Sequence, residues 1–492
     1  MKSNFNRILL FILMFSPFLH GCYGKLDSEM YDAINPSIFP KNANDIEALV
    51  TACYYPFRNA EWAGLYNNST GIQNTDLTTD ICMEQWAEER WLILNNLNWN
   101  ASTLQLRTWY SNYNQFSKMT MNIERISNVQ MDEDLKARYI AEIRCARGWM
   151  AFIMFNLYGP IPVASLDILE NPLTDVVIER PTQEWMVNYI ETELTEAAKV
   201  LPYKYGANDW GRFTKGMAQM ILLKLYMHEK NWSKAETIGR ELMKPEYEYR
   251  LMDNYSSIFT LENEQNSEII YATPNTIKTV QTYLPHVLPT NYPVKNANIP
   301  GWSGFRIPWF FYHTFEVKDK RLEVLVGEYT GTDGITYNEE NPGIYMWGGA
   351  IPVKYGEDPQ ATGHGSQIDW IVYRYADAVL LLAEAIANNN GNPTTEAIEL
   401  INMVRRRAGL DDLELKDYNT LKKINELILL ERGHELWFEG CRREDLIRHG
   451  KYIEYARQYK GSLNAQDHFV LFPIPQEYIN EGKGKIQQNP GY

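Results

Sequence analysis

Tryptophan and tyrosine side chains set among asparagines are the residues of this sequence best suited to binding chemistry. The chain holds 14 Trp and 32 Tyr, and two segments without helical periodicity are rich in them. A sugar ring has an apolar C–H face and polar edges, so a flat aromatic ring with an amide beside it suits carbohydrate binding. The alternative for each residue is that it anchors its own loop to the core. The candidate binding residues are Trp86, Trp91, Trp99, Asn100, Tyr283, Tyr292, Trp302, Trp309 and Tyr312.

The sequence signatures of catalysis and of metal binding are incomplete wherever they begin. His434 and Glu435 start a zinc-protease pattern, but Phe438 stands where the second histidine is required. The segment 363–365 lacks the later glycine of a dinucleotide-binding loop, and 301–304 has the wrong spacing for a nucleophile elbow. We therefore predict no catalytic residue, no metal ligands and no cofactor, and the sequence leaves open whether a calcium ion orders a loop. A glycoside hydrolase needs only two facing carboxylates, so the 62 acidic residues leave that alternative open.

The first 22 residues have the organisation of a bacterial export signal. A basic start precedes the apolar stretch 8–15, which is too short to span a membrane. Cys22 follows Leu19 and Gly21 as in a lipobox, where the thiol receives a diacylglycerol and becomes the new N-terminus. We expect a signal peptide at 1–21 and a lipid-anchored mature chain, because acyl chains supply membrane affinity without a spanning helix. An ordinary secretory signal with an incidental cysteine is the alternative.

The other four cysteines lack the spacing of metal ligands. Cys145 lies within an apolar helical pattern and is expected to be a buried free thiol. An exported protein could form a disulfide between Cys53 and Cys82, and the sequence leaves that pairing open.

The charge balance excludes nucleic acid as a partner. The net charge is −15 at pH 7, and an acidic surface repels phosphate backbones. The basic run 405–407 lies within a helical pattern, so we expect a solvated or ion-paired face there. No stretch after the signal reaches eighteen apolar residues, so the mature chain is not expected to span a membrane.

Helices must position the aromatic segments. From 104 to 243 apolar residues recur every three or four positions, as in amphipathic helices. The pair 214–228 and 233–243, and the stretch 375–404, resemble tetratricopeptide units, in which small residues let antiparallel helices approach closely. The segment 268–271 is typical of a short strand. The predicted fold is mainly α, with tetratricopeptide-like helical repeats, a large irregular loop-rich part and a few short strands.

We expect one compact mature unit with two regions. The first is helical and includes the aromatic segment 76–102. The second begins where Pro, Gly, Asn and aromatic residues replace the helical pattern. The expected bounds are 22–245 for the N-terminal region and 246–492 for the C-terminal region, which is loop-rich over 246–369, helical over 370–460 and ends in a tail at 461–492.

Several segments spread along the chain form a recognisable series. They include 139–149 (YIAEIRCARGW), 156–162 (NLYGPIP), 211–216 (GRFTKG), 373–377 (YRYAD), 431–448 (ERGHELWFEGCRREDLIR), 472–475 (FPIP) and 488–492 (QNPGY). No single segment is decisive, but their order and their coverage of the chain make the match specific. Together they resemble the SusD/RagB family of outer-membrane nutrient-binding lipoproteins.

This resemblance implies a function and a partner. It implies a non-catalytic protein on the surface of a Bacteroidetes-type outer membrane that captures glycans and delivers them to a SusC-like TonB-dependent transporter. It places the glycan face in loops comparable to the two aromatic segments. Charged residues at threes and fours in 431–448 are expected to form ion pairs. Capture of peptides on the same scaffold and a pure tetratricopeptide adaptor remain alternatives.

Overall fold

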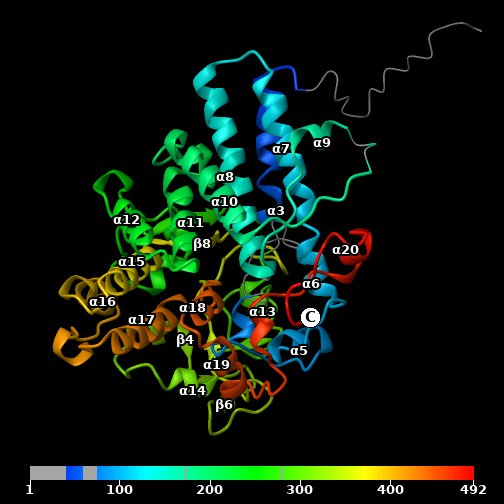
Figure 1. Ribbon diagram of the computed structural model, residues 1–492. Helices are drawn as coiled ribbons and strands as arrows, with labels where there is room; N and C mark the ends of the chain where they lie inside the picture. Colours follow the sequence, from blue (N-terminus) through cyan, green and yellow to red (C-terminus); the bar gives the residue numbers. More distant parts are fainter. Residues whose placement is uncertain (1–39, 59–74, 172, 174, 279–280) are drawn as a thin grey trace, which may run out of the picture.

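The computed structural model describes residues 40–58, 75–171, 173, 175–278 and 281–492. The predicted signal peptide at 1–21 and the predicted lipid site at Cys22 lie outside these residues. Helices form most of the regular structure, and the strands are short (Figure 1). This agrees with the predicted mainly α fold class. The tetratricopeptide likeness of the helix pairs remains a prediction.

The N-terminal half is built from helices whose starts follow local sequence signals. Thr182 and Thr214 precede α10 and α11, and each hydroxyl accepts a hydrogen bond from a backbone N–H of the first turn. Gly159, at φ +74°, ends the longest helix. The helices are α2 (Ala43–Ala52), α3 (Tyr55–Arg58), α5 (Glu89–Asn95), α6 (Leu104–Tyr110), α7 (Tyr113–Ser127), α8 (Glu133–Tyr158), α9 (Leu166–Glu170), α10 (Gln183–Val200), α11 (Lys215–His228) and α12 (Trp232–Leu242).

The C-terminal half alternates short elements with longer helices. Its helices are α13 (Tyr283–Val287), α14 (Trp309–Tyr312), α15 (Tyr375–Asn389), α16 (Thr395–Arg407), α17 (Leu421–Leu436), α18 (Arg442–Arg448), α19 (Tyr452–Tyr459) and α20 (Gln476–Glu481). Its strands are β2 (Ile269–Thr273), β3 (Phe305–Arg306), β4 (Leu325–Val326), β5 (Tyr329–Thr330), β6 (Thr336–Tyr337), β7 (Ile351–Pro352) and β8 (Trp370–Arg374). In the described part of the chain, β2 pairs with β8, β4 with β7 and β5 with β6, all antiparallel.

Consecutive helices lie side by side in a row. Helix α8 packs on α7 and α10, α10 packs on α11, and the row continues through α12 and α15 to α16 and α17 (Figure 1). Two glycines permit the closest approaches, because a Cβ on Gly148 or on Gly239 would lie 2.9 Å from Leu194 or Leu382. The predicted helix pairs 214–228 with 233–243, and 375–404, correspond to α11 with α12 and to α15 with α16.

The aromatic segment 76–102 contains more regular structure than its sequence indicates. It holds β1 (Met83–Glu84), which pairs with β3, and the seven-residue helix α5. Trp91 and Leu94 face the core from α5. Two buried apolar positions are too few to reveal a helical period, so the segment looks like a loop in the sequence.

Ion pairs account for the charged motifs of the C-terminal half. Glu435 pairs with Arg321, Arg374 and Arg407, and Arg432 pairs with Asp377 and Asp445, in each case as buried side chains. The expected ion pairs of 431–448 are therefore confirmed. The basic run is also ion-paired: Arg405 contacts Glu316 and Glu431, Arg406 contacts Glu399 and Asp412, and Arg407 contacts Glu268 and Glu435.

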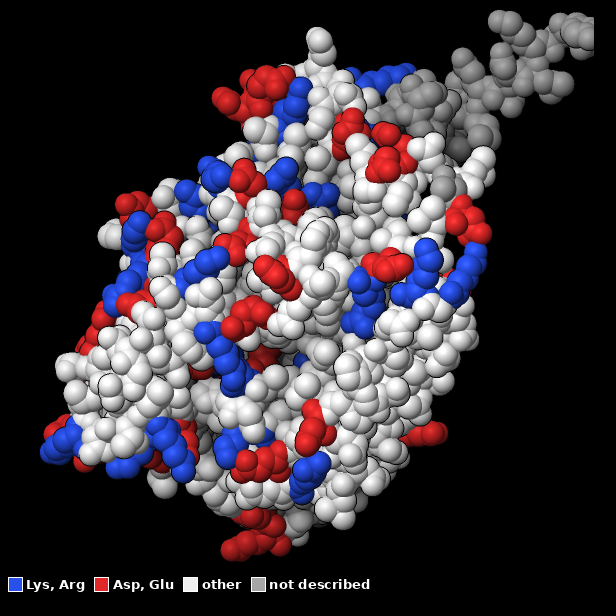
Figure 2. Space-filling view, in the orientation of Figure 1, with Lys and Arg blue, Asp and Glu red and all other residues white. Residues whose placement is uncertain are grey.

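On the surface, basic and acidic side chains lie close together, and uncharged side chains cover the region of α5 and α6 (Figure 2). Cys53, Cys82, Cys145 and Cys441 are buried and free, so the disulfide that the sequence left open does not form. No helix within the described residues is long and apolar enough to cross a membrane. In the same residues, no cluster of three or more His, Cys, Asp or Glu side chains could hold a metal ion.

Candidate functional site

A short strand pair brings two of the predicted tryptophans together from distant parts of the chain. Strand β1 pairs with β3 in the register Met83 to Arg306. The residue after β1 continues the pairing, because Gln85 N donates to Gly304 O at 2.7 Å. Trp86 then lies beside the backbone that precedes β3, and its indole Nε1 donates to the carbonyl of Trp302. Both indoles are half-buried.

The side chain of Gln85 connects three tryptophan-bearing segments. Its Nε2 donates to Ser303 O at 3.2 Å and to Tyr345 O at 3.0 Å, and its Oε1 accepts from Gly348 N at 2.9 Å. Each partner region carries an indole: Trp86 follows Gln85, Trp302 precedes Ser303, and Trp347 precedes Gly348. Trp347 is 51% exposed. We name Trp86, Trp302 and Trp347, together with Gln85, the tryptophan site.

Two histidines flank Trp302 edge to face. Its ring centroid lies 4.8 Å from that of His286 and 4.8 Å from that of His364, with the rings nearly perpendicular. His286 is buried, and burial lowers its pKa to about 4. Its Nδ1 lies 2.7 Å from Thr282 O, so the neutral ring donates from that atom. His364 is exposed, and Asn298 O accepts from the neighbouring Gly363 N at 3.2 Å. The exposed imidazole of His364 thus stands beside the Trp302 ring.

Arg306 fixes the loops beneath the site. Its side chain is fully buried and donates to the carbonyls of Tyr345, Val287 and Phe305 at 2.7 to 2.8 Å. Burial lowers the pKa of this guanidinium. The absence of a side chain at Gly304 leaves room for the Trp86 indole, because a Cβ there would lie 2.0 Å from the ring. The positions of the tryptophans are therefore set by tight backbone contacts.

Three of the predicted binding residues are core residues in this structure. Trp91 is 2% exposed and packs on Trp86 and Phe305. Trp99 is 3% exposed, contacts the aromatic rings of the C-terminal tail, and donates from Nε1 to Tyr492 Oη. Tyr283 has no exposed surface and donates to Pro352 O. Their ring faces are covered by protein, so we do not include them in the tryptophan site.

The remaining predicted residues lie outside the tryptophan site. Tyr292, Trp309 and Tyr312 are half-buried; Tyr292 and Trp309 pack against the hydrophobic cluster that includes Tyr329 and Tyr337, and Trp309 lies edge-on to Tyr312. Trp309 Nε1 donates to Met346 O at 3.1 Å, which ties α14 to the loop that carries Trp347. Asn100 is exposed and its Oδ1 accepts from Ser102 N, a local turn contact. No contact joins Asn100 to the tryptophan site among the described residues.

Sequence reasoning missed Trp347, Gln85, Arg306 and His286. Trp347 had a usable signal, because it lies in a Gly-rich and Tyr-rich stretch without helical period. The other three had none, because their partners are backbone atoms and, for Gln85, lie more than 200 positions away in the chain. Such contacts depend on the fold rather than on residue type.

The arrangement suits recognition rather than bond breaking. The tryptophan site offers apolar ring faces and an exposed histidine. Flat rings stack on apolar ligand faces, and the polar groups beside them can bind hydroxyl groups at the ligand edge.

The sequence matches two protein-family models and several known proteins. The family model described as "SusD family" matches residues 309–492, and the one described as "Starch-binding associating with outer membrane" matches residues 26–227. SusD-like protein P25 of Formosa agariphila is 23% identical, over 99% of this chain and 97% of its own. Starch-binding protein SusD of Bacteroides thetaiotaomicron is 22% identical, over 87% of this chain and 86% of its own.

Solved structures show the same fold. One described as a laminarin binding SusD-like protein superposes with a TM-score of 0.75 at 22% identity, over 92% of this chain and 100% of its own. At this identity the likeness establishes a shared architecture, and the two family models match both halves of the chain. The chain belongs to the SusD/RagB family.

Proposed function

We propose that this protein binds glycans without cleaving them, and that the tryptophan site holds the sugar. The observation that carries the proposal is that the side chain of Gln85, next to Trp86, holds the backbone of two further segments, one carrying Trp302 and the other Trp347. Aromatic faces beside an exposed imidazole suit a neutral sugar ring, whose apolar face can stack on an indole and whose hydroxyls can bond the imidazole. The names of the relatives, which refer to starch and to laminarin, support the same ligand class.

The test is binding of a glycan panel to the wild-type protein and to the double variant Trp302→Ala, Trp347→Ala. Soluble starch and laminarin in affinity gels, with maltohexaose and laminarihexaose in calorimetry, are the first probes. We expect one of them to bind without release of reducing ends. The double variant should lose at least about 30-fold in affinity, since two aromatic anchors contribute about 2 kcal/mol or more.

The matched control is Trp185→Ala. Trp185 is 45% exposed on α10 and stacks on Tyr189, away from the tryptophan site. This control should bind as the wild type does. Equal affinity in the double variant and the wild type would reject the tryptophan site. Failure of a broad panel of host, plant and microbial glycans would favour the peptide alternative.

We further propose that the protein is anchored by a lipid at Cys22, faces outward from the outer membrane, and delivers its ligand to a SusC-like TonB-dependent transporter. The lipobox-like sequence before Cys22 and the family membership support this. Labelling cells with a fatty-acid probe tests the anchor: the wild type should be labelled and Cys22→Ala should not. Co-purification of a TonB-dependent barrel from detergent extracts tests the partner, and its absence would argue against delivery.

A further inference from the structure

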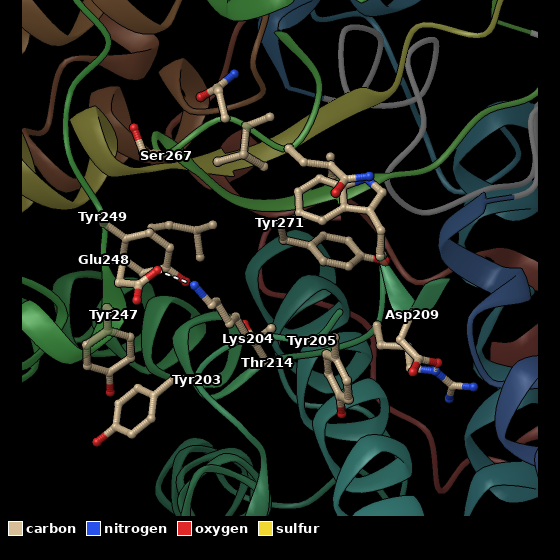
Figure 3. Close-up of a pocket in the computed structure, with 18 residues that line it drawn as sticks. Tyr203, Lys204, Tyr205, Asp209, Thr214, Tyr247, Glu248, Tyr249, Ser267 and Tyr271 are labelled. Carbon is tan, nitrogen blue, oxygen red and sulfur yellow. Dashed lines mark hydrogen bonds and ion pairs between the residues drawn. The ribbon is translucent and has the colours of Figure 1, made fainter. Parts of the chain in front are cut away.

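A second cavity lies apart from the tryptophan site, between the helical row and the first long strand. It is formed by the connection between α10 and α11 (residues 203–214), the turn 247–249 and the stretch 265–272 that leads into β2 (Figure 3). Its volume is about 350 Å³. Pockets that hold small ligands start at roughly 300 Å³, so this cavity has room for a short ligand.

Aromatic rings form its walls. Tyr203 meets Tyr247 edge to face with ring centroids 4.9 Å apart, and Tyr247 stacks on Tyr249 at 5.7 Å. Tyr205 and Tyr271 lie on the other side of the cavity (Figure 3). Gly216 makes the room for one wall, because a Cβ there would lie 2.0 Å from Tyr249 Oη. The walls therefore offer ring surface from several directions.

The charges around the cavity are balanced. Lys204 pairs with Glu248 across it (Figure 3). Arg212 pairs with Asp209 at 2.7 Å and with Glu142 at 3.0 Å. Because every one of these charged groups has an opposite partner, the cavity presents no surplus charge. An anionic or cationic ligand would have to break an ion pair, whereas a neutral ligand would not.

Polar groups of the lining remain available to a ligand. The Tyr203 hydroxyl and the Gln265 amide form no hydrogen bond with any residue that the structure describes, while Ser267 accepts from Arg250. Gln265 (φ +61°) and Glu248 (φ +57°) both adopt the left-handed backbone conformation, which costs a non-glycine residue about 1 kcal/mol or more.

The cavity is connected to the loop of the tryptophan site. Trp210 lines the cavity and donates from Nε1 to Asp369 Oδ2 at 2.6 Å. Asp369 is five positions after His364, which contacts Trp302. Five residues span at most about 18 Å. One polymer chain of several sugar units is long enough to reach both places.

We propose that this cavity is a second carbohydrate site, which takes one or two neutral sugar units of the same glycan that the tryptophan site holds. The proposal rests on the proposed function for its ligand class, and its location stands on the geometry above. Two linked contacts raise the affinity for a polymer above that for a short oligosaccharide. The cavity should therefore matter more for polysaccharide than for oligosaccharide binding.

The test combines hydrogen exchange with affinity, on the full mature chain. Maltotriose and laminaritriose are the probes for exchange, and soluble starch and laminarin are the polymers. With the trisaccharide that binds, we expect slower exchange over 203–214 and 265–271. The variant Tyr203→Ala, Gln265→Gly should abolish that protection and lower polymer affinity at least about 10-fold, while binding at the tryptophan site persists. Glu246→Ala, an exposed neighbour that does not line the cavity, is the control.

The outcomes separate the two proposals. Two results would overturn the second site and leave the proposed function intact. One is slower exchange at the tryptophan site alone, and the other is slower exchange at 203–214 that persists in Tyr203→Ala, Gln265→Gly. Protection of the cavity alone, unchanged in Trp302→Ala, Trp347→Ala, would support the cavity and reject the tryptophan site. Absence of protection anywhere with both trisaccharides would overturn the cavity site.

Discussion

At the scale of single residues, the side chain of Gln85 holds two loops in position. Its amide makes three hydrogen bonds to backbone atoms of two loops, and each of those loops carries an indole. A half-buried amide that satisfies three backbone groups is costly to remove, because the groups left behind lose their partners. Gln85 is thus a positioning residue for the tryptophan site and touches the ligand only through its neighbours.

We expect Gln85→Met to weaken glycan binding about 10-fold while leaving the fold intact. Methionine has a similar length but cannot hold Ser303, Tyr345 and Gly348, so the loops bearing Trp302 and Trp347 gain freedom that binding must remove. Calorimetry with the bound oligosaccharide measures the loss. Gln476→Met is the control, since the Gln476 side chain is exposed and donates to Asn480 of its own helix. Unchanged affinity in Gln85→Met would show that the loops hold their positions without it.

Residue types alone could not fully distinguish the aromatic residues of the tryptophan site from those of the core. Trp86 and Trp302 are half-buried and adjacent, whereas Trp91, Trp99 and Tyr283 are buried in the core. Their neighbours in the sequence do not separate the two groups, because Trp86, Trp99 and Trp302 are all flanked by polar or small residues and yet Trp99 is buried. Burial depends on contacts with the C-terminal tail and with strand β3. These contacts join positions hundreds of residues apart, so the local sequence does not reveal them.

At the scale of elements, the long helices were predictable and the short ones were not. Helices α10 and α11 begin after a threonine that caps the first turn, and α10 shows buried positions at threes and fours. Helix α15 has no capping side chain, but its apolar stretch is long enough to indicate a helix. Helices α5 and α14 have seven and four residues, too few to show a period. Two-residue strands such as β1 and β3 form because their partners are held nearby, which no local pattern reveals.

Close helix packing depends on Gly239, where α12 meets α15. A Cβ at this position would lie 2.9 Å from Leu382 Cδ1 and 3.0 Å from its Cβ. We expect Gly239→Leu to push the helices apart and to lower the free energy of unfolding by about 2 kcal/mol, as overpacked cores do. Urea denaturation measures the change. Thr237→Leu, at an exposed position of the same helix, should cost less than about 0.5 kcal/mol; an equal cost for both would contradict close packing at Gly239.

At the scale of the whole molecule, buried charges join the two halves of the chain. Burial alone would raise the pKa of Glu435, but Arg407, Arg374 and Arg321 outweigh it and hold that pKa well below its usual range. Burial is likewise outweighed at Asp377, where Lys224 and Arg432 lower the pKa to about 2. Both carboxylates stabilise the fold above pH about 4, where unfolded carboxylates are ionised, and lose this effect as the pH falls toward 2.

Asp76 has the opposite effect on how folding stability depends on pH. It is fully buried near the turn that holds Gly440, whose N–H donates to Asp76 Oδ2 at 3.1 Å. Burial raises its pKa from 3.8 to about 7. Between these two values the folded state keeps a proton that the unfolded state has lost, so folding stability falls as the pH rises from about 4 to about 7.

Replacing Asp76 by asparagine should remove this loss. Asparagine is uncharged at every pH and can still accept the hydrogen bond from Gly440. We expect Asp76→Asn and the wild type to be similar in stability near pH 4. The variant should become more stable as the pH rises, by on the order of 2–4 kcal/mol at pH 8. The difference between the two proteins isolates Asp76, because every other titrating group is common to both. Thermal unfolding of both proteins from pH 4 to pH 8 measures this difference in stability. The control is Asp253→Asn, at an exposed position. A stability difference that does not change with pH would mean that Asp76 is ionised in the folded protein throughout this range.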